Sequence, residues 1–243
     1  MSDASAREQE IDNSPHPLDH VIWEALTTRH KALSEGDELA RRYPVRIGPL
    51  AATLDMTPAS FQSLERLVAP GDRVALFTLD EVPPSAAATF DINAMGGLHQ
   101  MIKMAEAAPT GATPIVPLDA SDVADMLALV ELTHPGPFNV GTHELGGFIG
   151  VRSDGQLVAM AGQRMRIDGF TEVSAVCVHP DYRGRGYAAD LVLAVSQAIS
   201  DRGETPFLHV FSENPSAIAL YTKVGFSVRQ TLRLTVLERP GEQ

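Results

Sequence analysis

A loop rich in glycine and arginine at residues 183–188 has the composition of an anion-binding site. Its sequence is Arg183-Gly184-Arg185-Gly186-Tyr187-Ala188, and it joins a segment that predicts a strand to one that predicts a helix. Glycine allows left-handed backbone angles and close approach to a ligand, and the unpaired N–H groups at a helix N-terminus favour an anion. The loop therefore predicts a cradle for a pyrophosphate group, to which both arginines can add positive charge.

Two common phosphate-binding loops are excluded by the same residues. No Gly-Lys-Ser/Thr sequence follows, as a Walker loop requires, and the three glycines of a dinucleotide-binding fingerprint are absent. Because glycine-rich turns also precede helices that bind no ligand, a purely structural role for the loop stays open at this point.

The strand and the helix that must hold this loop are visible in the hydrophobic pattern. Residues 171–178 predict a strand, and residues 188–199 predict a helix with one apolar side. Strands at 115–118, 148–151, 157–162, 207–211 and 228–237 alternate with helices between Asp119 and His134 and at 215–224. This alternation predicts an α/β or α+β fold, in which helices pack on the faces of a sheet.

The first hundred residues have a weaker pattern. Residues 1–16 are polar and acidic and predict a flexible tail, after which Asp19 is the expected cap of a first helix. The other expectations are a weak edge strand at 45–54, a helix from Thr57-Pro58 and a strand at 73–79, while the pattern of residues 95–104 is ambiguous.

Small residues and proline at 107–114 predict a linker. This linker would divide the chain into an N-terminal α/β domain at 17–108 and a second domain at 113–243. A length of 243 residues allows one large domain or two small ones.

Two segments of the second domain resemble the GNAT superfamily of acetyl-CoA-dependent N-acetyltransferases. Residues 172–192 resemble its motif A, in which a strand ending in Val-x-Pro, here Val178-His179-Pro180, precedes Arg/Gln-x-x-Gly-x-Gly/Ala and a helix. Residues 214–226 resemble the signature Asn-x-x-Ala-x-x-x-Tyr-x-x-x-Gly-Phe. The resemblance covers residues 114–238, and two motifs in the right order make it specific.

The resemblance implies a GNAT fold, which is a mixed central sheet flanked by helices. Residues 172–187 are most similar to the glycine N-acyltransferase-like branch of the superfamily. In that branch the region before the catalytic domain can be a degenerate copy of the same fold, so residues 17–108 are a candidate for such a GNAT-like copy.

The resemblance also implies acetyl-CoA as co-substrate and identifies residues that would hold it. Backbone groups of the motif A strand would pair with pantetheine, and an N–H there would stabilise the oxyanion. Asn214 would reach the pantetheine arm and would also cap a helix. The strand residues are Val176, Cys177 and Val178, and the pyrophosphate would lie on Arg183, Gly184, Arg185, Gly186, Tyr187, Ala188 and Ala189.

Two residues compete for the role of general base, which an amine acceptor requires because it is mostly protonated at neutral pH. Glu172 lies six residues before Val178, where several members of the superfamily carry a catalytic glutamate. His209 lies on the neighbouring strand, where relatives also carry a base, and an imidazole suits the task. A structural histidine packed between Phe207 and Phe211 is the alternative for His209.

Tyr221 corresponds to the tyrosine of the second motif and is the expected general acid for the leaving thiolate. It follows Asn214 by two helical turns, so both project from the same face. A tyrosine that only packs in the core is the alternative. Cys177 lies between valines and is expected to be an inert apolar residue, not a nucleophile.

The composition excludes several other classes of protein. A net charge of −12 argues against a nucleic-acid partner and mildly favours an amine substrate. The single cysteine fits a reducing cytoplasm. No apolar run predicts a transmembrane helix or a membrane partner, and no histidine pair with an acid predicts a metal site. We expect a monomer or a homodimer.

The expected function is transfer of an acetyl group from acetyl-CoA to a primary amine in a ternary complex. A non-catalytic acyl-CoA-binding module is the main alternative, and a nucleotide-phosphate enzyme is a weaker one. The acceptor pocket is expected between residues 131 and 144, with His134, Phe138 and His143 as lining candidates.

Overall fold

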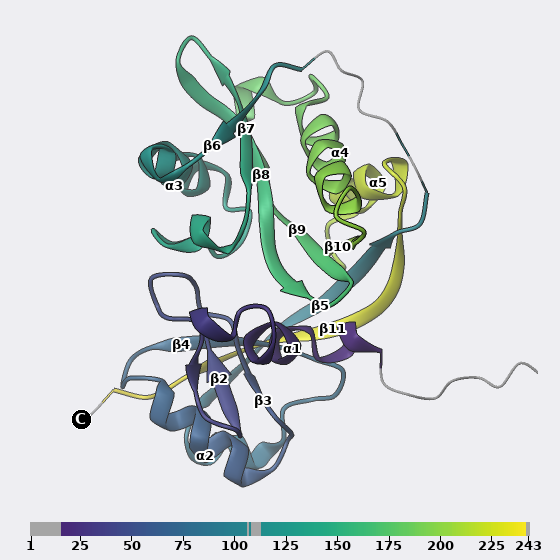
Figure 1. Cartoon of the computed structure of the whole chain (residues 1–243). Coiled ribbons are helices and arrows are strands. Elements are labelled where there is room, and N and C mark those ends of the chain that lie inside the picture. Colours follow the sequence, from purple (N-terminus) through teal and green to yellow (C-terminus); the bar gives the residue numbers. More distant parts are fainter. Residues whose placement is uncertain (1–15, 106, 108–112, 242–243) are drawn as a thin grey trace, which may run out of the picture.

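The computed structural model describes residues 16–105, 107 and 113–241, and its main feature is a mixed sheet of eight strands. The strands are β4 (Arg73–Thr78), β5 (Asp91–Lys103), β6 (Ile115–Leu118), β7 (Phe148–Ser153), β8 (Gln156–Ile167), β9 (Phe170–Val178), β10 (Thr205–Phe211) and β11 (Phe226–Glu238). Their order in the sheet is β4-β11-β5-β10-β9-β8-β7-β6 (Figure 1). Only β9 and β10 are parallel neighbours.

Helices cover both faces of this sheet. The apolar sides of α4 (Tyr187–Ser200) and α5 (Pro215–Lys223) pack on one face, while α1 (Val21–Thr27) and α3 (Val123–Thr133) pack on the other (Figure 1). A small sheet of β1 (Glu35–Gly36), β2 (Ala40–Arg42) and β3 (Ala51–Thr53) packs with α2 (Pro58–Leu67) beside β4. The expected mixed sheet flanked by helices is confirmed.

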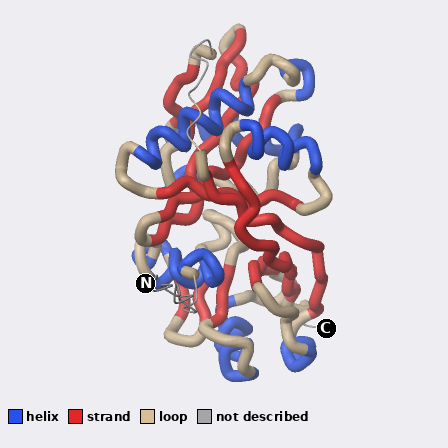
Figure 2. The backbone as a smooth tube through the Cα atoms, turned by 90° about the vertical axis from the view of Figure 1, so that its right-hand side faces the viewer, coloured by secondary structure: helices blue, strands red, loops and turns tan. Residues whose placement is uncertain are grey.

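Strands from both sides of the expected linker belong to the large sheet. β5 precedes the linker, yet it lies between β10 and β11 and pairs with β11 from Asp91↔Glu238 to Lys103↔Phe226. In Figure 2, strands connect the upper and lower parts of the molecule, and both parts carry helices. Most of residues 107–114, and the tail at 1–15, lie outside the described residues. The division into two domains stays a prediction.

Several local predictions are confirmed and others are wrong. Thr57 caps α2, which begins at Pro58, and α3 ends before His134, as expected. The predicted strand at 45–54 is wrong over most of its length, because residues 44–48 turn the chain and only Ala51–Thr53 is a strand. Asp19 does not cap α1 either: His16 caps the preceding 3-10 helix, and the Asp19 carboxylate accepts a hydrogen bond from the His16 amide.

The two parallel strands separate halfway along their length. Pairing of β9 with β10 ends at Glu172↔Phe207, although β9 continues to Val178 and β10 to Phe211. Just beyond that point the register between β8 and β9 shifts, and Ala175 has a φ of 52°. This bulge lets β9 bend away from β10, and the β10-facing backbone groups of its last residues have no strand partner in the described sheet.

Ala175 holds a left-handed conformation that an L-residue adopts only at a cost of about 1–2 kcal/mol. We expect Ala175→Gly to leave the free energy of unfolding unchanged or to raise it, and Ala175→Val to lower it. Urea denaturation measures both changes. Ala159→Gly, at a buried position of β8 without positive φ, is the control and should lose stability. Equal losses for the two glycine variants would contradict this interpretation.

Candidate active site

A cavity of about 750 Å³ occupies the gap between the separated strands. Its lining comes from both faces of the sheet. On the α4 and α5 side the lining includes Val176, Val178, Ala188, Asn214, Ala217, Leu220 and Tyr221, and on the opposite side it includes Pro49, Leu50, Ala75, Phe77, Leu234 and Val236. The gap is therefore a passage through the sheet, open to residues that are far apart in the sequence.

The glycine-rich loop meets this cavity at the N-terminus of α4. Gly184 and Gly186 have φ values of 77° and 86°, and a side chain at either position would find open space, so it is the backbone angle that favours glycine. Gly186 is the N-cap of α4 and no side chain caps the helix there. The first N–H groups of a helix have no intrahelical acceptor, so this end of α4 is free to bind an anion.

Some of the residues that the sequence predicts to bind acetyl-CoA line the cavity. Asn214 lines it and also caps α5, because its Oδ1 accepts a hydrogen bond from the amide of Ala217 at 3.1 Å. Arg185 instead stacks on the Tyr182 ring at 4.6 Å. The predicted residues that line the cavity are Val176, Cys177, Val178, Arg183, Ala188, Asn214 and Tyr221, whereas Gly184, Arg185, Gly186, Tyr187 and Ala189 do not line it.

The two candidate bases contact each other directly. Glu172 is bonded on both oxygens by Arg164, with N–O distances of 2.7 and 2.8 Å, and His209 Nδ1 lies 2.8 Å from Glu172 Oε1. The side chains of Glu172 and His209 are only 1% and 2% exposed. His209 and Arg164 line the cavity, whereas Glu172 does not.

The charge of Glu172 is held by its partners. Burial alone would raise its pKa, but the Arg164 guanidinium and the hydrogen bonds from Arg164 and His209 lower the pKa to about 2. Because an ionised carboxylate can only accept hydrogen bonds, His209 must donate to it from Nδ1. Glu172 is thus an anionic anchor with its oxygens occupied, which leaves Nε2 as the basic nitrogen of His209.

The hydrogen bonds continue beyond His209 into β5 and β11. The side-chain amide of Gln100 lies 3.1 Å from His209 Nε2 and is bonded by Arg229, which in turn is bonded to Asp19. We call the six residues Arg164, Glu172, His209, Gln100, Arg229 and Asp19 the polar row. It crosses β8, β9, β10, β5 and β11, which are five adjacent strands, and ends before α1.

Tyr221 and Cys177 both line the cavity from buried positions. Burial raises the pKa of the Tyr221 phenol to about 12. Burial also raises the pKa of the Cys177 thiol to about 11, which agrees with an inert cysteine. Both groups therefore keep their protons at neutral pH.

The far end of the cavity is formed jointly by the two halves of the chain. The last residue of α3, Thr133, and the loop after it, from His134 to Pro137, line this end. This loop is bonded to the turn before β3, since Thr142 Oγ1 donates to the carbonyl of Ile47 at 2.6 Å. Of the other expected lining residues, Phe138 packs against Phe148 and His143 bonds the carbonyl of Val140, so neither lines the cavity.

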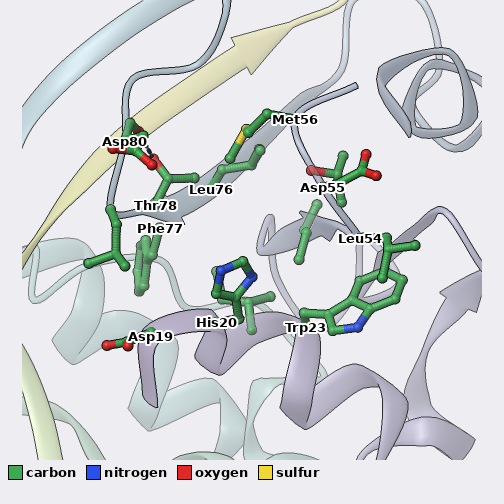
Figure 3. Close-up of a pocket in the computed structure, with 15 residues that line it drawn as sticks. Asp19, His20, Trp23, Leu54, Asp55, Met56, Leu76, Phe77, Thr78 and Asp80 are labelled. Carbon is green, nitrogen blue, oxygen red and sulfur yellow. Dashed lines mark hydrogen bonds between the residues drawn. The ribbon is translucent and has the colours of Figure 1, made fainter. Parts of the chain in front are cut away.

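A second cavity of about 250 Å³ lies between α1, the β3–α2 loop and the end of β4. In Figure 3 the ring of His20 lies between Phe77 and Trp23, and Asp19 lies at the edge. Phe77 lines both cavities, and Asp19 is the last member of the polar row. None of the predicted catalytic residues lines this second cavity.

Three residues of the polar row, Gln100, Arg164 and Arg229, are absent from the sequence-based predictions. Gln100 lies in residues 95–104, whose pattern was ambiguous because β5 mixes buried and exposed residues without regular alternation. A single amide among Leu98, Met101 and Ile102 was the available signal. Among the described residues, no group of acidic, histidine or cysteine side chains could hold a metal ion.

Comparison with known proteins gives consistent matches. A family model described as FR47-like protein matches residues 148–234, from β7 into β11. A solved structure of a putative acetyltransferase from the GNAT family, from Novosphingobium aromaticivorans, is 37% identical to this chain. That match covers 93% of this chain and 99% of the other, with a TM-score of 0.82.

Two curated proteins match shorter segments. The N-alpha-acetyltransferase RimI of Mycobacterium tuberculosis is 39% identical over 82 residues, which are 32% of this chain and 51% of that protein. An uncharacterised N-acetyltransferase of Bacillus subtilis, YobR, is 36% identical over 62 residues, 25% of each chain. The matches thus span a quarter to a half of these relatives. No helix in the described part of the chain is long and apolar enough to span a membrane.

We expect Glu172→Gln to lower the free energy of unfolding by about 3–5 kcal/mol, because it leaves the buried Arg164 charge without its counterion. Urea denaturation gives this value. Glu204→Gln is the matched control, since its partner Arg166 is 39% exposed and the loss should be much smaller. A Glu172→Gln protein that is as stable as the wild type would contradict the anchoring role.

Proposed function

Because the chain belongs to the GNAT family of acetyltransferases, we propose that it transfers an acetyl group from acetyl-CoA to a primary amine while both substrates are bound. One observation carries the proposal. The cavity leads from the free N-terminus of α4, through the gap between β9 and β10, to Tyr221 and His209. A site for a phosphate group at the N-terminus of α4, a gap wide enough for an extended ligand and two side chains that can exchange protons therefore lie along one path.

Acetyl-CoA would bind along this path as follows. Its pyrophosphate would lie on the N–H groups of Gly184 to Ala189, where the helix dipole favours negative charge. Its pantetheine arm would pair with the backbone groups of Val176, Cys177 and Val178 that face β10, as an added strand does. Asn214 would contact the same arm from α5.

The reaction then needs one bond made, one bond broken and two protons moved. The amine nitrogen forms a bond to the thioester carbonyl carbon, and the bond from that carbon to sulfur breaks. Of the two candidate bases only His209 lines the cavity, and because Nδ1–H is bonded to Glu172 the proton of the amine would go to Nε2, from which the N–H of Gln100 must first be displaced. Glu172 orients the imidazole and does not take the proton itself, since its pKa is about 2.

Tyr221 gives its proton to the leaving sulfur. Burial raises the pKa of the Tyr221 phenol to about 12, so the phenol keeps its proton at neutral pH until the thiolate forms beside it.

The acceptor is a primary amine on a small molecule, an amino acid or a peptide N-terminus. The relative RimI is named as an N-alpha-acetyltransferase, which supports the last of these. The membership of the glycine N-acyltransferase-like branch and the cytoplasmic location stay predictions. A non-catalytic acyl-CoA-binding module remains the alternative, but such a module needs neither His209 nor Tyr221 at the cavity.

Release of CoA thiol from acetyl-CoA with a panel of primary amines tests the function. We expect turnover by the wild type, and a loss of about a hundredfold in kcat for Tyr221→Phe, with acetyl-CoA binding nearly unchanged. Tyr43→Phe is the control, because it removes a buried hydroxyl that bonds His30 outside the cavity. Binding of acetyl-CoA without turnover for any amine would favour the binding-module alternative.

If the loop at 183–188 holds the pyrophosphate of acetyl-CoA, a change in its backbone should weaken binding. Ala at position 186 or 203 strains a positive φ, so Gly186→Ala and Gly203→Ala, at opposite ends of α4, should lose similar stability, about 1–2 kcal/mol. Only Gly186→Ala should also weaken acetyl-CoA binding, by about tenfold, through a misplaced amide. Calorimetric titration with acetyl-CoA measures this difference. Equal affinity in both variants would show that the loop does not hold the pyrophosphate.

A further inference from the structure

We propose that the acceptor is an amine on an apolar body and that it enters the cavity as its free base, without the extra proton that it carries in water. The inference rests on the proposed acetyl transfer and names the class of amine that this transfer would use. It follows from the cavity lining, which has apolar side chains on the face opposite α4 and α5 and no carboxylate among the described lining residues.

The wall of the cavity opposite α4 and α5 is an apolar strip on two paired strands. Phe77 of β4 lies opposite Leu234 of β11, and Ala75 lies opposite Val236 in the same ladder. Residues two apart on a strand share a face, so these four side chains, which we call the acceptor strip, form one continuous surface. Burial of an apolar body against this surface is favourable in proportion to the area that it covers.

The acceptor strip runs from the site of transfer to solvent. At one end the Phe77 ring lies against the His209 ring, with the centroids 5.0 Å apart. At the other end the next pair in the ladder, Arg73 and Glu238, is an ion pair whose side chains are 66% and 33% exposed. The four residue steps from Phe77 to Arg73 span about 13 Å. This length accommodates an apolar body the size of a leucine side chain beside the reacting amine.

The charged groups around the cavity offer no partner to an ammonium ion. The protein has a net charge of −12, yet none of the described residues that line the cavity is an aspartate or a glutamate. Glu172 and Glu238, which lie beside it, are already bonded to Arg164 and Arg73. The other titratable groups of the lining are Arg183, His134, Cys177, His209 and Tyr221. The attraction of the acidic protein for amines therefore does not extend into the cavity.

An amine in these surroundings favours its neutral form. Removal from water disfavours the charged state, and so do nearby positive charges, so both lower the pKa of a bound amine. The state of His209 agrees with this, because its Nε2 accepts the N–H of Gln100 and its Nδ1–H is bonded to Glu172. The extra proton of an ammonium ion would go to the solvent before binding. Only the proton released by attack on the thioester would then be taken up in the site.

The acceptor strip and the missing carboxylate together select one class of amine. An α-amino group has a pKa of about 8, whereas the lysine amine has a pKa of about 10.4. At pH 7 about one tenth of the first is free base, but less than about one thousandth of the second. An α-amine beside an apolar side chain therefore meets both requirements, while lysine side chains and polyamines meet neither.

The pH dependence of kcat/KM tests the inference on the unmodified full chain. We expect kcat/KM for leucinamide to rise with pH and to level off near pH 8, the pKa of its α-amine. For pentylamine, whose pKa of about 10.4 resembles that of lysine, it should still rise about tenfold per unit up to pH 9. Serinamide carries the same kind of amine on a polar body, and its kcat/KM should be at least about tenfold lower than that of leucinamide.

Two outcomes of this experiment would overturn the inference. Binding of the ammonium ion would make kcat/KM for leucinamide decline above pH 8, where that ion disappears. Equal values for leucinamide and serinamide would show that the acceptor strip does not hold the apolar body. Acetylation of none of the three amines at any pH would instead overturn the proposed function.

A carboxylate added to the acceptor strip gives the second readout. Val236→Asp should lower the KM of pentylamine at pH 7 by about fivefold or more relative to Val236→Asn, because only the aspartate stabilises a bound ammonium ion. Leu234→Asp and Leu234→Asn repeat the comparison if the first pair does not fold. Equal KM values within a folded pair would show that the wild-type cavity does not exclude the ammonium ion, and would overturn the inference.

Discussion

The buried ion pair between Arg164 and Glu172 is the interaction on which the rest of the site depends. The Glu172 carboxylate is only 1% exposed, and a charge so buried is tolerated only when its hydrogen-bonding groups are satisfied. Here each partner of Glu172 comes from a neighbouring strand. Glu172 is also the last residue of β9 that pairs with β10. The polar row therefore lies where β9 and β10 begin to separate. Its hydrogen bonds connect five adjacent strands next to the gap between β9 and β10.

Beyond Glu172, toward the C-terminal ends of β9 and β10, the two strands no longer pair. Between Val173 and Val178 the edge of β9 facing β10 is left without a strand partner, and the cavity fills the space. Exposed backbone groups on a strand are a binding surface for an extended ligand. The ion pair at Glu172 and the gap between β9 and β10 are thus adjacent along β9, and the bulge at Ala175 lies where the gap begins.

Much of this arrangement could be predicted from local sequence. The loop at 183–188 depends on residues that are adjacent in the chain, and its glycines have the positive φ values that their composition suggested. Tyr221 and Asn214 share a helix, so their common face follows from helical geometry.

The contact between His209 and Glu172 could not be predicted, because it depends on the register of β9 against β10. Gln100 was harder still, since the meaning of one buried amide depends on β10 and β11, which lie more than a hundred residues away. The strand at 45–54 was wrong because apolar residues there fold into a turn that packs on the loop after α3.

The passage through the sheet has a consequence for the binding of the two substrates. Acetyl-CoA would enter along α4 and α5, whereas the opposite end is walled by Pro49, Leu50, Phe77 and the loop after α3. An acceptor bound at that end would lie on the other face of the sheet from acetyl-CoA, so the two substrates would not compete for the same space. The separation of β9 and β10 thereby allows both to be bound at once, as direct transfer requires.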